Sequence, residues 1–117
     1  IAGIRGDTEM GFRELEKAAE SENAVRFDAM MMLMYLHEKE GETKEAVKYA
    51  ERLTERFSDN VIFLFKTGEL HEKLGNIDRA VENYRRVIRE NNENLQEMTQ
   101  MSKKRVDELY ALGLIDQ

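Results

Sequence analysis

The chain has 117 residues, of which 41% are hydrophobic and 36% are charged, and its formal net charge is −6. This composition indicates one globular, highly charged domain rather than a disordered chain. The negative charge argues against binding to nucleic acid or to anionic lipid, since both require a basic surface. No stretch approaches the roughly 18 consecutive apolar residues of a membrane-spanning helix, so we expect no direct membrane insertion.

Cysteine is absent from the chain, and the first residue is not methionine. Without cysteine the chain has neither a disulfide framework nor a thiolate site. No secretion signal is visible at the start. We therefore expect the chain to be a fragment of a longer protein.

Helix-favouring residues dominate the whole sequence, and proline is absent. Residues 1–5 are expected to be the end of one helix. The helices expected after it follow in the order 6–23, 25–40, 43–57, 60–74, 77–91 and 95–112. Gly41 and Gly75 suit the left-handed residue that ends a helix, and Thr43 and Asn76 suit the cap that begins the next one.

Two short stretches of the sequence are nearly identical, namely "HEKEG" at 37–41 and "HEKLG" at 71–75. Compared position by position, the segments 27–60 and 61–94 that contain them are identical at nine positions. The identical pairs are Leu36/Leu70, His37/His71, Glu38/Glu72, Lys39/Lys73, Gly41/Gly75, Ala46/Ala80, Val47/Val81, Arg52/Arg86 and Asn60/Asn94. Each copy predicts a helix, a turn at the glycine and a second helix, so the chain repeats one helical hairpin.

A helix–turn–helix unit of about 34 residues resembles the tetratricopeptide repeat family. Small residues stand where that family brings helices close together, at Ala46, Ala80 and Gly68, and in the shorter first segment at Gly11. The large packing positions hold Leu33, Ala50, Leu53, Leu64, Tyr84 and Val87. Where the residues differ from the usual ones, we expect the same interface to be repacked.

The resemblance implies an all-α fold, an alpha-alpha superhelix built as a tetratricopeptide-type helix–turn–helix solenoid. The whole chain, 1–117, is expected to be one such domain. Its expected parts are a half repeat at 6–23, full repeats at 27–60 and 61–94, and a C-terminal capping helix at 95–112.

The resemblance also implies that the first helix of each repeat lines a concave groove. Both first helices carry more apolar residues than one packing stripe requires. The side chains left over are Met31, Tyr35, Ile62 and Phe65, with the charged Lys66 and Glu69 beside them. We interpret them as the floor and edges of a groove that binds a helix or peptide of a protein partner. The expected function is noncatalytic protein–protein interaction, as a scaffold or adaptor.

Other interpretations of these side chains remain open. They could pack against a neighbouring domain or subunit, or against the last helix. The chain would then be a self-association module or an intramolecular docking module of a larger protein. A homodimer would be favoured by an uncovered face near Ile4 or near Leu109.

The sequence offers no site for chemistry. His37 and His71 occupy a packing position of the repeat, so a structural role is expected and no metal site. No HExxH motif, no glycine-rich phosphate loop and no Ser/His/Asp arrangement is present, so we expect no catalytic residue, no cofactor and no enzyme activity. The basic residues at 85–89 and 103–105 are interpreted as solvated helix faces, with contact to RNA or to an acidic protein as the alternative.

Overall fold

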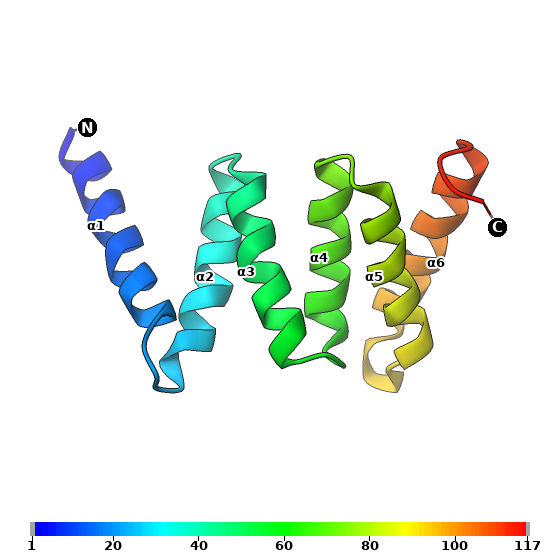
Figure 1. Cartoon of the computed structure of the whole chain (residues 1–117), viewed down its shortest axis with the longest axis horizontal. Helices are drawn as coiled ribbons and strands as arrows, with labels where there is room; N and C mark the ends of the chain where they lie inside the picture. Colours follow the sequence, from blue (N-terminus) through cyan, green and yellow to red (C-terminus); the bar gives the residue numbers. More distant parts are fainter. Residues whose placement is uncertain (1, 117) are drawn as a thin grey trace. The chain divides into compact units, whose positions relative to one another are not determined.

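The computed structural model describes the backbone of residues 2–116 and the side chains of residues 11–116. Within that part of the chain the regular structure is helical, with no strand (Figure 1). The elements are α1 (Ala2–Ala19), α2 (Val25–Lys39), α3 (Thr43–Arg56), α4 (Val61–Lys73), α5 (Ile77–Glu90), the short 3₁₀ helix η1 (Glu93–Leu95) and α6 (Gln96–Ala111). The expected all-α class is confirmed.

The chain divides within α3 into two compact units, Ile1–Leu53 and Thr54–Gln117. In the first unit α1 packs against α2, and the ring of Tyr49 in α3 stacks on that of His37 in α2, with the centroids 5.9 Å apart. The buried side chains of this unit include Leu33, Met34, Ala46, Ala50 and Leu53, each with 0% exposure. Leu33, Ala46, Ala50 and Leu53 were expected to be packing residues, and Met34 joins them in the core.

The first helix departs from the expectation for the start of the chain. α1 is continuous from Ala2 to Ala19 and passes through Gly6, so residues 2–5 do not belong to a separate helix. One glycine inside a helix costs only about 1 kcal/mol, which neighbouring helix formers offset in the absence of proline. Gly11 also has no close neighbour, because a Cβ added there would meet nothing within 4 Å.

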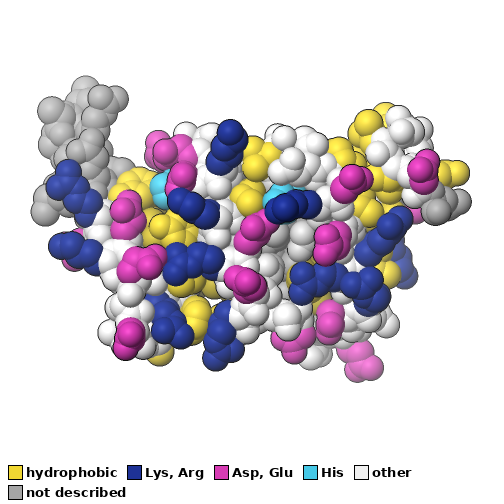
Figure 2. All heavy atoms as spheres, in the orientation of Figure 1, with side chains coloured by type: hydrophobic (Ala, Val, Ile, Leu, Met, Phe, Trp, Pro, Cys, Tyr) yellow, Lys and Arg dark blue, Asp and Glu magenta, His cyan; other side chains and the backbone are white. Residues whose placement is uncertain are grey.

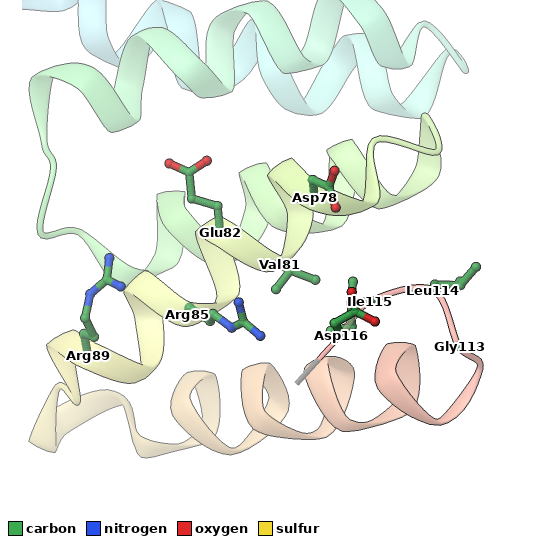
Figure 3. A pocket seen from close by; sticks show the side chains of 9 residues that line it. All are labelled: Asp78, Val81, Glu82, Arg85, Arg89, Gly113, Leu114, Ile115 and Asp116. Atoms are coloured by element: carbon green, nitrogen blue, oxygen red, sulfur yellow. The ribbon is translucent and has the colours of Figure 1, made fainter.

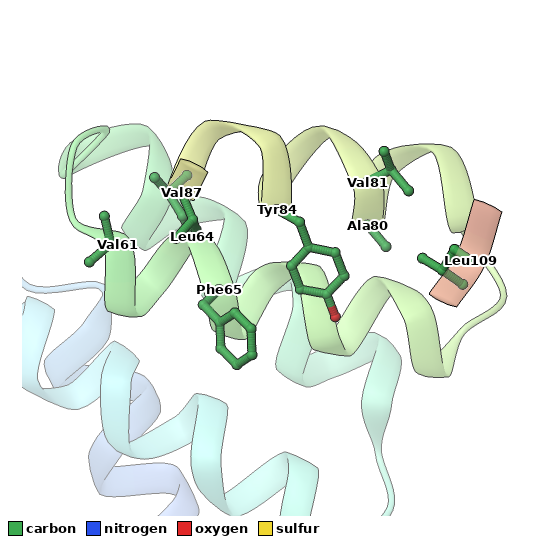
Figure 4. Packing of buried hydrophobic residues seen from close by; sticks show 8 residues of the cluster. All are labelled: Val61, Leu64, Phe65, Ala80, Val81, Tyr84, Val87 and Leu109. Carbon is green, nitrogen blue, oxygen red and sulfur yellow. The ribbon is translucent and has the colours of Figure 1, made fainter. Parts of the chain in front are cut away.

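In the second unit α4 and α5 form a hairpin, and α6 packs against α5 and α4. Figure 4 shows the core, where buried side chains from the three helices meet. Its members are Val61, Leu64, Phe65, Ala80, Val81, Tyr84, Val87 and Leu109. Gly68 permits the close crossing of α4 and α5, because a Cβ at this position would lie 2.7 Å from Cε1 of Tyr84.

Three helices end at a glycine in the left-handed conformation, with φ of 79° at Gly41, 79° at Gly75 and 75° at Gly113. At each helix end two backbone hydrogen bonds form. The N–H of Gly41 donates to the carbonyl of Glu38 and the N–H of Glu42 donates to the carbonyl of His37, and the same pattern recurs at Gly75 and Gly113. Both bonds supply a donor to carbonyls in the last turn, which have no hydrogen-bond partner within the helix. Only a residue without a Cβ adopts this φ at little cost.

The two expected helix caps are not formed as predicted. Thr43 is the first residue of α3 rather than the residue before the helix. Asn76 does precede α5, but its side chain makes no capping hydrogen bond; its amide nitrogen lies 3.4 Å from Nδ1 of His71 instead. Asn60 caps the start of α4, because its side chain accepts hydrogen bonds from the N–H groups of Ile62 and Phe63.

Candidate protein-interaction surfaces

The first group of candidate residues lies on α2. Tyr35 is 45% exposed, and Met31 is half-buried. Two residues that sequence reasoning did not select are at least as accessible, since Met32 is 51% exposed and Val25 is 48% exposed. Residues 25, 32 and 35 fall within one face of a helix with 3.6 residues per turn. α2 therefore presents an exposed apolar face.

The sequence of α2 does not distinguish Met31 from Met32 as the exposed methionine. α2 is apolar on nearly every side, with methionine at 30, 31, 32 and 34. A helix without a polar side gives no periodic signal that separates core positions from surface positions. The structure distinguishes core from surface methionines, because Met30 and Met34 are buried while Met32 is exposed.

The second group of candidate residues lies on α4, and the structure splits it. Ile62 is 44% exposed, and Lys66 and Glu69 follow it on the same helix face, with Nζ and Oε1 3.8 Å apart. Phe65 is only 6% exposed and its ring centroid is 5.5 Å from that of Tyr84. Phe65 is thus a core residue and does not form part of an exposed groove floor.

Both histidines lie among packed side chains. His71 is 2% exposed. His37 has the ring of Phe12 at 5.0 Å on one side and that of Tyr49 on the other, and its Nδ1 lies 3.3 Å from a carboxylate oxygen of Glu42. These surroundings fit the expected structural role. In residues 11–116 no three His, Cys, Asp or Glu side chains are grouped so that they could hold a metal ion.

A polar network joins the three helices of the second unit. The hydroxyl of Tyr84 in α5 donates to Oε1 of Glu72 in α4 at 2.9 Å. Arg105 of α6 donates from Nε to the same oxygen at 3.1 Å, and it also pairs with the other oxygen of Glu72 and with Glu108. Burial, followed by the bond to Glu72, raises the pKa of the Tyr84 phenol. The bond to Glu72 also raises the pKa of Arg105.

Charges of both signs are interspersed on the face that Figure 2 shows, and several basic side chains gather over α5. The guanidinium of Arg86 in α5 donates to the backbone oxygen of Ser58 at 3.1 Å. Arg85 and Arg89 are exposed. None of the helices in the described part of the chain has the length and apolar character needed to cross a membrane.

Repeated helical hairpins, left-handed glycines after the first helices and small residues at the helix crossing define a tetratricopeptide-type repeat protein. The family model of Iml2/Tetratricopeptide repeat protein 39 matches residues 1–112, and the chain belongs to this family. The resemblance drawn from the sequence is thereby confirmed. A search among curated proteins finds no match. Protein binding is typical of tetratricopeptide-type families, which are generally noncatalytic.

Proposed function

We propose that the chain is a noncatalytic protein-interaction module whose first helices bind a helix or extended peptide of the partner. The observation that carries the proposal is the exposed apolar face of α2, formed by Val25, Met32 and Tyr35. Ile62, with the ion pair of Lys66 and Glu69, is the corresponding exposed apolar residue on α4. The expected repeat boundaries, 27–60 and 61–94, belong to the same proposal, because they make α2 and α4 the first helices.

Burial of the exposed side chains on binding would supply enough free energy for a modest affinity. Fully burying a large apolar side chain is worth about 1.5–3 kcal/mol, so a half-exposed one gains about 1 kcal/mol on binding. The three residues of α2 together then contribute a few kcal/mol before the costs of association. Methionine at 31 and 32 adapts its shape to different ligands, which suits a surface that takes side chains of several shapes.

The test is an affinity pull-down from the source-cell lysate, with bound proteins identified by mass spectrometry. The baits are the unaltered chain, an α2 variant (Met32→Glu with Tyr35→Glu) and an α4 variant (Ile62→Glu). Lys48→Glu is the matched control, because Lys48 is well exposed on α3 and its replacement changes the net charge as much as the α2 variant does. Circular dichroism checks that all baits are equally folded.

We expect a protein that binds the unaltered chain and the Lys48→Glu control but is lost from the α2 variant, the α4 variant or both. Each variant reports on its own helix, so the two faces are tested independently. If all four folded baits retain the same proteins, the exposed faces of α2 and α4 are not binding sites and the proposal fails.

Self-association is the second candidate function. Tyr110 and Leu112, at the end of α6, are 45% and 71% exposed, and Leu114 is 51% exposed. Leu109, which the sequence suggested for this role, is a core residue, and the side chain of Ile4 lies outside the described part. We expect the mass from light scattering to rise with concentration and Leu112→Glu to suppress the rise. A mass that stays monomeric at every concentration excludes this candidate.

A further inference from the structure

A groove runs along α5 on the side where the segment 113–116 turns back beside that helix (Figure 3). Its volume is about 590 Å³. Val81 and Arg85 point from α5 toward the returning segment, and Ile115 faces them. The groove shares no residue with the exposed faces of α2 and α4, so it is a separate surface of the molecule.

The returning segment has the features of the first turn of a second helix. Gly113 ends α6 in the same left-handed conformation and with the same two backbone bonds as Gly75, which ends α4. Leu-Ile-Asp follows Gly113, as Asn-Ile-Asp follows Gly75. Ile115 and Ile77 are both partly buried against the same hydrophobic core. The groove beyond Ile115 therefore lies where a helix that continued this segment would run beside α5.

The charges along the groove are separated. On α5, Asp78 and Glu82 lie toward the start of the helix, and Arg85 and Arg89 lie toward its end. Asp116 adds a carboxylate from the returning segment. The two arginines are one helical turn apart and exposed. Among the described residues, neither guanidinium has a carboxylate or carbonyl partner. This pair is thus available to an anionic group from outside.

The first unit shows how a second helix is bound in this chain. Arg52 on α3 donates from Nη1 to a carboxylate oxygen of Glu20, the residue that follows α1, at 2.9 Å. α1 and α3 are the second helices of successive units in the proposed repeat. The repeat equivalent of Arg52 on α5 is Arg86, which is already bound to the backbone oxygen of Ser58. Carboxylates of an occupant would instead meet the exposed Arg85 and Arg89.

We propose that the groove beside α5 binds an amphipathic helix of a partner protein. Apolar residues of this helix cover Val81 and Ile115, and two of its carboxylates, one turn apart, pair with Arg85 and Arg89. The partner helix lies along α5, beside the returning segment. The groove is therefore a binding site for acidic helices, in addition to the apolar faces of the first helices.

The experiment measures fluorescence anisotropy with two labelled peptides of about 18 residues, long enough to be helical in water. One has a stripe of leucines flanked by glutamates one turn apart, and the other has lysines in place of the glutamates. The glutamate peptide should bind the whole chain about tenfold more tightly. The Arg85→Glu/Arg89→Glu variant should invert this preference. Perturbed NMR signals of Val81 and Ile115 should locate the bound peptide.

Lys103→Glu with Lys104→Glu is the control, because it changes the net charge equally on exposed residues of α6 outside the groove. The control should keep the preference for the glutamate peptide. The proposal is overturned if neither peptide binds, if both bind equally or if the control inverts the preference. It is also overturned if the perturbed signals fall on α2 or α4, a result that would leave the proposed function of those faces intact.

Discussion

Gly68 and Tyr84 meet where α4 crosses α5, and their contact leaves no room for a methyl group. The Cβ of an alanine at 68 would lie 2.7 Å from Cε1 and 2.9 Å from Cδ1 of a ring that is fully buried. The ring cannot turn aside without displacing its neighbours. Overpacking of this kind costs about 1–3 kcal/mol, more than the roughly 1 kcal/mol that alanine gains over glycine inside a helix.

We therefore predict that Gly68→Ala lowers the free energy of unfolding, measured by urea denaturation, by about 1–2 kcal/mol. Gly11→Ala is the matched control in α1, where an added Cβ meets nothing within 4 Å. The control should leave the stability unchanged or raise it by up to about 1 kcal/mol. A stable Gly68→Ala protein would mean that the two helices separate easily.

Two buried hydroxyls of α6, those of Thr99 and Ser102, have no hydrogen-bond partner among the described residues. A desolvated hydroxyl without a partner costs about 1–3 kcal/mol. We predict that Thr99→Val and Ser102→Ala each raise the unfolding free energy by about 1 kcal/mol. Thr67→Val is the control, because the Thr67 hydroxyl donates to the carbonyl of Phe63 at 2.7 Å, and its loss should bring no gain. Destabilised variants would show that both hydroxyls are satisfied in solution.

The sequence predicted the crossing residues of the two full repeats well but misplaced Gly11, and it separated exposed from buried residues on the first helices only in part. Gly68, Ala46 and Ala80 were expected at close contacts because the repeat fixes their positions, and Ala46 and Ala80 are fully buried. Phe65 was misjudged because its neighbours along the helix do not reveal that Tyr84 of another helix lies against its ring. Contacts between distant residues leave no periodic signal in the sequence of one helix.

At the scale of elements, α6 is held in the second unit by polar contacts as well as by Leu109. Glu72 on α4 accepts from Tyr84 on α5 and from Arg105 on α6, so one carboxylate joins three helices. An amphipathic pattern predicted a helix at 95–112, close to the observed α6. This pattern does not reveal that Arg105 donates to Glu72, which lies 33 positions earlier in the chain.

The Tyr84 phenol should make stability depend on alkaline pH. Its pKa is raised above the ordinary value of 10 in the folded state, first by burial and then by the bond to Glu72. The folded protein therefore holds this proton more tightly than the unfolded chain does. The resulting stabilisation is fully present below pH 10 and is lost as the pH rises from there through the folded-state pKa.

We predict that Tyr84→Phe is less stable near neutral pH by about 1 kcal/mol, because the hydrogen bond is lost. Its unfolding free energy should also fall less steeply above pH 10 than that of the unaltered protein. Urea denaturation across this pH range gives both results. Tyr110→Phe removes an exposed hydroxyl from α6 and serves as the control. Parallel curves for Tyr84→Phe and the unaltered protein would contradict the assigned role of the phenol.

At the scale of the whole molecule, the second unit has a core of its own. Every member of that core lies between Val61 and Leu109. We predict that the fragment 58–117 folds into helices and unfolds cooperatively, with lower stability than the whole chain because a domain of about 60 residues buries little surface. Circular dichroism during heating tests this. A fragment without helical signal would show that the second unit folds only in the presence of residues 1–57.

The pairing of helices that are neighbours along the chain has a mechanical consequence. In the described part, α1 packs on α2, and α4, α5 and α6 pack on one another. Contacts between neighbours have low contact order, which favours folding within milliseconds. A pulling force applied to the two ends therefore acts mainly on interfaces between neighbouring helices. Stretched in optical tweezers, the chain should extend in several small steps at low force.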